Sequence, residues 1–163
     1  MNFKLRKTAI VLLMLTSIFP ALARDWRVYP GAMGYQSYSN STKITRYGGI
    51  LQNNETNKWV YLELPFVQDV DEKKVKTSGI TVKDRSPSNS ISARLWASWG
   101  SALWATPSQS TNGAGPNYEY LEFPELAPSI SGEAQRQYYF TIALPPKWNN
   151  LASQIHSYYL LED

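Results

Sequence analysis

A single histidine, His156, and the absence of cysteine restrict the catalytic chemistry open to this chain. Nucleophilic catalysis of the Ser-His-Asp or Cys-His kind needs a base beside the nucleophile. By strand alternation, His156 is expected to share a face with Tyr158 and Leu160, and one histidine without a motif indicates a structural or exposed side chain. Zinc is disfavoured too, because clusters of nitrogen and sulfur ligands are absent.

Carboxylates are the second group that could do chemistry, since a glycosidase holds two of them across a cleft. The candidates are Glu63, Asp69, Glu119, Glu122 and Glu125. Glu122, outward-facing near Tyr120, is the most suggestive of them. Sequence spacing does not make any two converge, and solvated surface acids are the simpler interpretation. We therefore expect a protein that is not an enzyme, with a small glycan hydrolase as the less favoured alternative.

The compact acidic cluster Asp69, Asp71 and Glu72 is the place where calcium could bind, because calcium takes six to eight oxygen ligands. Three lysines follow almost at once and offset its charge. A mixed-charge, solvated loop is the better interpretation, and nothing matches an EF-hand loop. We expect no cofactor, with calcium at this cluster as the alternative.

Outward-facing aromatic residues are the strongest functional signal. Trp96, with Tyr118 and Tyr120 on a later strand, is predicted to form a platform, and Trp59 with Tyr61 is a second possible pair. Sugar rings stack their C–H faces on such rings, which combine an apolar body with a polar edge. The competing interpretation is that these rings cover the edges and ends of the fold, because aromatic residues are ordinary strand formers.

The elements that must carry these residues are strands, and the organising one is a hairpin over residues 91–106. Apolar and polar residues alternate with a period of two on its first strand. Gly100-Ser101 suits a type II′ turn. In that register Trp104 lies opposite Ala97 on the inward face, and Trp96 faces the other way.

Short alternating segments separated by turn residues fill the rest of the chain, which is typical of a β-sandwich. Further strands are expected at 33–38, 44–52, 58–67, 80–83, 118–123, 136–144 and 155–161. Gly48-Gly49 suggests a bulge or a close backbone approach within 44–52. Residues 68–78, 84–89 and 107–117 are expected as loops or turns, the last of them mobile. The prediction is a single antiparallel sandwich, jelly-roll-like or Ig-like, of eight or nine strands.

Within these strands, one-sided apolar residues predict the core. They include Val60, Leu62, Leu64, Leu121, Phe123, Tyr138, Phe140, Ile142 and Leu144.

Residues 1–23 are predicted to be a signal peptide, with a basic start, an apolar run and the small-x-small site Ala21-Leu22-Ala23. The apolar run is too short for an ordinary membrane span. The β-sandwich domain is then 24–163, secreted or periplasmic and not inserted in a membrane.

Removing this segment changes the charge of the protein. The whole chain has 16 basic and 13 acidic side chains, and three basic ones lie in residues 1–23. The mature charge is therefore zero, which argues against nucleic-acid and anionic-membrane partners.

Several short motifs follow one another along the mature chain. They are Pro30, Gly31 and Met33; Asn53, Trp59, Tyr61, Pro65 and Asp69; Tyr138, Tyr139, Pro145 and Pro146; and Ile155, Tyr158 and Glu162. In this order the chain resembles a family of small secreted bacterial β-sandwich proteins, mostly uncharacterised. Relatives often carry cysteines where this chain has Gly34, Leu64, Ala93 and Ile142. The resemblance implies the fold and export, and no activity.

Two functions follow from these observations. The first is an exported, non-catalytic sandwich that binds carbohydrate or another extracellular surface through exposed aromatic residues. The alternative is a secreted structural or effector protein whose partner is another protein.

Overall fold

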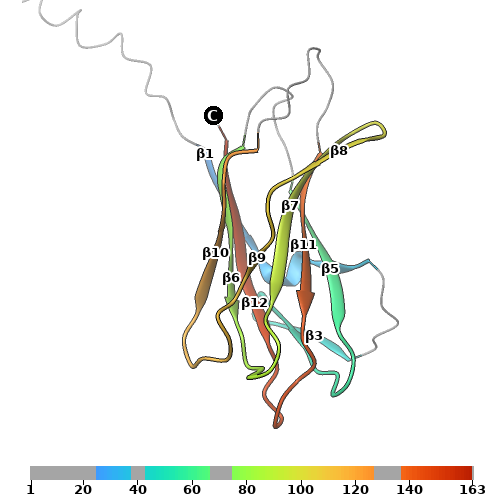
Figure 1. The fold of residues 1–163 in the computed structure, drawn as a ribbon, viewed down its shortest axis with the longest axis vertical. Coiled ribbons are helices and arrows are strands. Elements are labelled where there is room, and N and C mark those ends of the chain that lie inside the picture. The colour runs from blue at the N-terminus through green and yellow to red at the C-terminus, as the bar shows by residue number, and fades with distance from the viewer. Residues whose placement is uncertain (1–24, 38–42, 67–74, 127–136, 163) are drawn as a thin grey trace, which may run out of the picture.

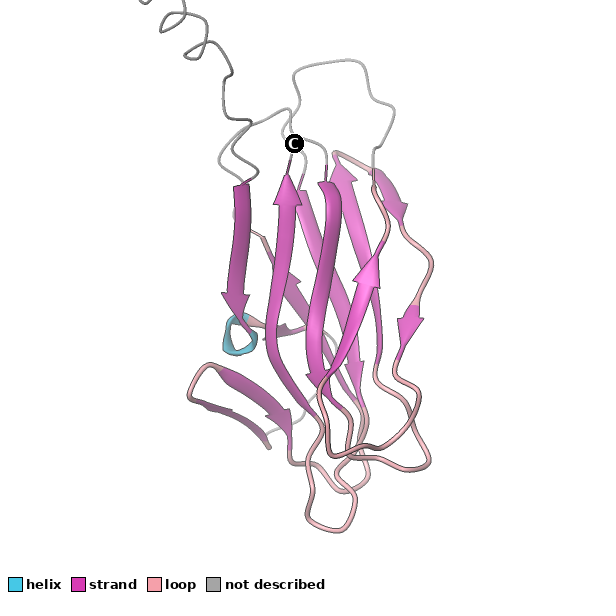
Figure 2. Ribbon diagram, turned by 90° about the vertical axis from the view of Figure 1, so that its left-hand side faces the viewer, coloured by secondary structure: helices cyan, strands magenta, loops and turns pink. Residues whose placement is uncertain are grey.

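A computed structural model describes residues 25–37, 43–66, 75–126 and 137–162, and in these residues the chain folds into two facing antiparallel sheets (Figure 1). Sheet A contains β1 (Asp25–Pro30), β3 (Ile44–Tyr47), β4 (Ile50–Asn53), β6 (Val75–Lys83), β10 (Glu119–Phe123) and β12 (Gln154–Glu162). Sheet B contains β2 (Tyr35–Gln36), β5 (Val60–Pro65), β7 (Ser92–Trp99), β8 (Ala102–Ala105), β9 (Gln109–Ser110) and β11 (Gln137–Leu144). A short 3-10 turn, η1 (Gly31–Met33), follows β1 (Figure 2).

The strand order shows which segments become neighbours. Sheet A runs β10-β6-β12-β4-β3, and β1 also pairs with β12; sheet B runs β2-β5-β11-β7-β8, and β9 also pairs with β7. The predicted all-β antiparallel sandwich is confirmed. Within the described residues there are twelve strands rather than the eight or nine expected, because β1 and β9 were not predicted and the segment 44–52 forms two strands, β3 and β4. None of the helical segments in the described ranges has the length and apolarity needed to cross a membrane.

The core lies between the sheets, where the predicted alternation holds. The buried residues include Val60, Leu62, Leu64, Leu121, Phe123, Tyr138, Phe140, Ile142 and Leu144. Burying one large apolar side chain contributes about 1.5–3 kcal/mol, so this shared layer is the main force that holds the sheets together. The Tyr158 hydroxyl of β12 also donates a hydrogen bond of 2.8 Å to the carbonyl oxygen of Pro65 in β5, which links the two sheets.

The hairpin of β7 and β8 has the predicted register. Ala97 pairs with Trp104, and Trp104 packs against the core. Gly100 has φ +54°, and Ser101 does not share a positive φ, as a type II′ turn requires.

Gly48 and Gly49 do not form the predicted bulge, whereas the alternative, a close backbone approach, is found at Gly49, whose carbonyl oxygen accepts a hydrogen bond of 2.8 Å from the Ala32 N–H. The two glycines form a turn. Both have positive φ, +56° and +83°, which is the type I′ pattern that joins two antiparallel strands tightly. The single strand expected over 44–52 is therefore the hairpin β3–β4, with Tyr47 paired to Ile50.

Two predicted loops contain strands. β6 begins at Val75, inside the expected loop 68–78, and Ser78 is fully buried. The stretch 107–117 contains β9, which pairs with β7. Before β9 the Thr106 N–H donates to the carbonyl oxygen of Leu95, and after it the Thr111 N–H donates to that of Ile91. These strand segments were not predicted because they are polar, and backbone pairing between strands does not require apolar side chains.

A buried carboxylate ties together the end of the sandwich where β6 finishes. Asp84 is 1% exposed, and its Oδ1 accepts hydrogen bonds from the Ser86 N–H (2.9 Å) and the Ser153 hydroxyl (3.1 Å). Its Oδ2 accepts from the Ile91 N–H (3.1 Å) and the Thr111 hydroxyl. The expected turn over 84–89 is therefore anchored from within by one aspartate.

Candidate functional site

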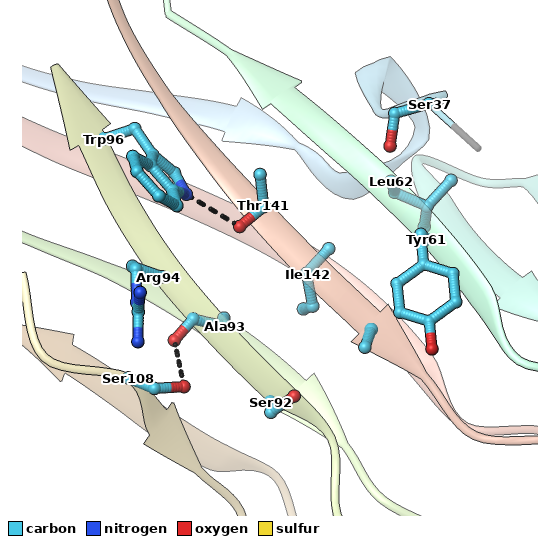
Figure 3. A pocket seen from close by; sticks show the side chains of 11 residues that line it. Ser37, Tyr61, Leu62, Ser92, Ala93, Arg94, Trp96, Ser108, Thr141 and Ile142 are labelled. Atoms are coloured by element: carbon cyan, nitrogen blue, oxygen red, sulfur yellow. Dashed lines mark hydrogen bonds between the residues drawn. The ribbon is translucent and has the colours of Figure 1, made fainter. Parts of the chain in front are cut away.

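A depression of about 330 Å³ lies on the outer face of sheet B, over the strands β5, β11 and β7 (Figure 3). Its side chains come from alternate positions of these strands, which point away from the core. The principal ones are Tyr61, Ser92, Arg94, Trp96, Thr141 and Ala143. Tyr61 and Trp96 lie on opposite sides of it in Figure 3.

The hollow arises from the sizes of side chains across the sheet. Tyr61, Ala143 and Ser92 are aligned across β5, β11 and β7 by the strand register. The small Ala143 and Ser92 leave space beside the ring of Tyr61, and the larger Arg94 and Trp96 follow at the next outward positions along β7. The result is a concave surface with aromatic rings at its sides and small or polar residues at its floor.

The indole of Trp96 is held in a defined position. Its Nε1–H donates a hydrogen bond of 2.9 Å to the Thr141 hydroxyl oxygen on the neighbouring strand. The guanidinium carbon of Arg94 lies 5.6 Å from the centre of the Trp96 ring, within the range of a cation–π contact. A ring fixed before a ligand arrives loses little conformational freedom on binding.

The second aromatic wall is Tyr61, whose side chain is 47% exposed. Trp59 comes just before β5, is half-buried and does not line the depression. The predicted pair of Trp59 and Tyr61 therefore contributes one ring to this surface.

Tyr118 and Tyr120 lie elsewhere, so the predicted platform with Trp96 is wrong. β10 pairs with β6 in sheet A, whereas Trp96 belongs to β7 in sheet B, and the outward faces of the two sheets point in opposite directions. Tyr120 is 68% exposed there. That each ring binds a ligand on its own face stays a prediction.

His156 lies beside Tyr118 and does not share a face with Tyr158, contrary to the prediction from strand alternation. The two rings meet edge to face with centroids 4.4 Å apart, and Lys83 Nζ lies 5.0 Å from the Tyr118 ring centre. A register shift between Ile155 and Ser157 reverses the alternation of β12, so Tyr158 is buried while His156 is not. Burial, and then the charge of Lys83, lower the pKa of His156.

Beside the depression, Tyr35 on β2 donates a hydrogen bond to the carboxylate of Glu63. This hydrogen bond, followed by burial and the charge of Glu63, raises the pKa of Tyr35 to about 12. Glu63 pairs in register with Thr141, which in turn pairs with Arg94 across the sheet. The face therefore separates an acidic group on β5 from a basic group on β7.

Sequence reasoning missed Arg94, Ser92 and Thr141 as site residues. Arg94 has a usable signal, because it lies two positions before Trp96 and so shares its face. Thr141 has none without knowledge of which strands are neighbours.

The chemistry available in the depression is stacking and hydrogen bonding. No aspartate or glutamate is among its described lining residues, so the two converging carboxylates of the hydrolase alternative are not found in it. In the ranges that the structure describes, no group of three His, Cys, Asp or Glu side chains could hold a metal ion. The calcium candidates Asp69, Asp71 and Glu72, like residues 1–23, lie outside the described residues.

No protein-family model and no curated protein matches this chain. Among solved structures it is similar to a family two carbohydrate esterase from Cellvibrio japonicus, with a TM-score of 0.48 and 8% identity over 86% of this chain. The match covers 34% of the esterase, so the chain spans about a third of that protein's length.

Two further likenesses are to smaller proteins. One is a low-affinity xylan-binding module, CBM86, from the gut symbiont Roseburia intestinalis (TM-score 0.44, 14% identity, 85% of this chain and 96% of that one). The other is the CBM36-1 domain of a multidomain xylanase from the hindgut metagenome of Trinervitermes trinervoides (TM-score 0.42, 10% identity, 84% and 96%). These likenesses concern the fold, and the proposals below rest on the side chains of this chain.

Proposed function

We propose that this protein is an exported, non-catalytic β-sandwich that binds carbohydrate in the depression on the outer face of sheet B. The observation that carries the proposal is the fixed indole of Trp96, hydrogen-bonded to Thr141 and placed across the hollow from Tyr61. The export part rests on the signal peptide expected over residues 1–23.

The composition of the depression fits the chemistry of a sugar. A pyranose ring presents apolar C–H groups on its faces and hydroxyls around its rim. Aromatic rings complement the faces, and the side chains of Ser92, Thr141 and Arg94 offer hydrogen-bond partners to the rim. Ligand sites generally combine an apolar, concave surface with a few polar groups in this way.

The test is binding of the purified protein to a glycan array, followed by calorimetry with the oligosaccharides retained. Trp96→Ala and Tyr61→Ala should each weaken binding strongly. Tyr47→Ala is the matched control, because it removes an exposed ring from β3 of sheet A, and Tyr47 is not a candidate binding residue.

Three results would contradict the proposal. They are no binding to any glycan, equal binding by all three variants, and hydrolysis of the bound oligosaccharide. A pull-down that recovers one protein partner while glycans stay unbound would favour the structural or effector alternative.

A further inference from the structure

Arg94 is the only arginine in the described residues whose guanidinium makes no hydrogen bond and no ion pair. Arg46 Nη2 donates a hydrogen bond of 2.9 Å to the carbonyl oxygen of Gly34. Arg85 Nη1 donates one of 3.5 Å to the carbonyl oxygen of Gly115. That of Arg27 lies 3.8 Å from the carboxylate of Glu162. The guanidinium of Arg94 lies over the face of the Trp96 ring, an arrangement that leaves its N–H donors available to a ligand.

The position of Arg94 makes these donors useful. Its side chain is half-buried on the rim of the depression, between Ser92 and Trp96 on β7. An arginine stays charged at any physiological pH. Its partial removal from water increases the energetic value of a partner for that charge.

The depression holds no acid of its own to neutralise this charge. Its described lining residues include no carboxylate. The closest acid in register is Glu63, two strands away across Thr141, and its carboxylate already accepts the hydroxyl of Tyr35. The β7 side of the hollow is therefore positively charged and lined by the hydroxyls of Ser92, Ser108 and Thr141.

Building on the proposed function, we infer that the carbohydrate bound here is acidic, with a uronic acid whose carboxylate pairs with Arg94. The planar guanidinium matches a carboxylate in a two-pronged hydrogen bond, which a neutral hydroxyl cannot reproduce. The sugar ring lies over the floor at Thr141 and Ala143, between Trp96 and Tyr61, and its other hydroxyls face the serine and threonine side chains.

The test compares oligosaccharides that differ only at the carboxyl group, which is charged in one member of each pair and neutral in the other. Oligogalacturonates are measured against the same oligomers after complete methyl esterification, and glucuronoxylan oligosaccharides against the same material after reduction of the carboxyl groups. Calorimetry is run with the wild type, Arg94→Gln, Arg94→Lys and Lys83→Gln. The last variant is the control, since it removes one positive charge from the outer face of sheet A.

We expect the wild type to bind at least one acidic member about tenfold or more tightly than its neutral counterpart, because charged hydrogen bonds are the strong ones. Arg94→Gln should abolish this preference, Arg94→Lys should keep part of it, and Lys83→Gln should leave it intact. Rising salt should weaken the wild-type complex with the acidic member.

The outcomes distinguish a failure of the inferred acidic ligand from a failure of the proposed carbohydrate binding. Equal or better binding of the neutral members, unaffected by Arg94→Gln, overturns the acidic ligand and leaves the proposed function standing. Binding to no glycan, acidic or neutral, overturns both. If Arg94→Gln fails to fold, Arg94→Lys and the salt dependence of the wild type decide, and binding to the acidic members that does not respond to salt overturns the inference.

Discussion

Replacing Asp84 with alanine or asparagine tests whether one buried carboxylate organises the end of the sandwich. Asp84 is 1% exposed, and its two oxygens accept four hydrogen bonds. Two of the donors are backbone N–H groups, those of Ser86 and Ile91, which cannot turn away. The other two are hydroxyls of Thr111 and Ser153, which can rotate toward other acceptors.

The structure sets the order of the effects. In Asp84→Asn, one oxygen becomes an NH₂ group. At the Oδ1 position this group leaves the Ser86 N–H facing a donor, whereas at the Oδ2 position the Ile91 N–H keeps the Thr111 hydroxyl oxygen, 2.9 Å away, as an acceptor. Since an unsatisfied buried donor costs about 1–3 kcal/mol, we expect Asp84→Asn to lose no more than that. Asp84→Ala removes both oxygens and leaves a void as well, so we expect a larger loss of about 2–4 kcal/mol in the free energy of unfolding, from the unsatisfied Ser86 N–H together with the lost packing.

Urea unfolding followed by tryptophan fluorescence measures both variants, because the chain has six tryptophans. The control is Glu125→Ala, which removes an exposed carboxylate and should cost less than about 0.5 kcal/mol. An Asp84→Ala protein as stable as Glu125→Ala would refute the reasoning, and so would Asp84→Asn being less stable than Asp84→Ala.

Two further predictions concern β12. Gly31→Ala should destabilise the fold by about 1–3 kcal/mol or more, since its new Cβ would clash with the backbone carbonyl oxygen of Ile155 in β12. Gly115→Ala, whose new Cβ has its closest contact at 3.9 Å, should be neutral. Thermal unfolding compares the two variants, and equal melting temperatures would be contrary to expectation. Burial and the charge of Lys83 lower the pKa of His156 below 6.5, so near this pH the unfolded chain binds more protons than the folded one. The contribution of neutral His156 to the free energy of unfolding is therefore complete above about pH 6.5 and is lost as the pH falls through the folded pKa. His156→Gln should reduce the loss of stability between about pH 7 and pH 5, and a pH profile identical to that of the wild type would contradict this.

Much of the fold is predictable from the sequence because burial in a strand follows a period of two. The inward residues of β5, β10 and β11 and the pairing of Ala97 with Trp104 came directly from this rule. The rule fails where one extra residue enters a strand, as at His156, since a bulge is set by pairing with β6.

The site is harder to predict because it is assembled across strands that are distant in sequence. Alternation predicts that Trp96 and Tyr61 point outward, and both line the depression on the outer face of sheet B. It could not tell that β11 lies between their strands, and so it missed Thr141, the acceptor of the indole N–H. For the same reason it grouped Trp96 with Tyr120, although their strands, β7 and β10, belong to different sheets.

The order of the strands has a consequence for the speed of folding. β12, last among the described strands, pairs with β6 on one side and with β1 and β4 on the other. Sheet A therefore stays incomplete until Gln154–Glu162 has joined it, and β1 must pair with a strand at the other end of the described sequence. Such non-local pairing is slow to form, so we expect the β7–β8 hairpin to appear early and sheet A to close in a late, rate-limiting step.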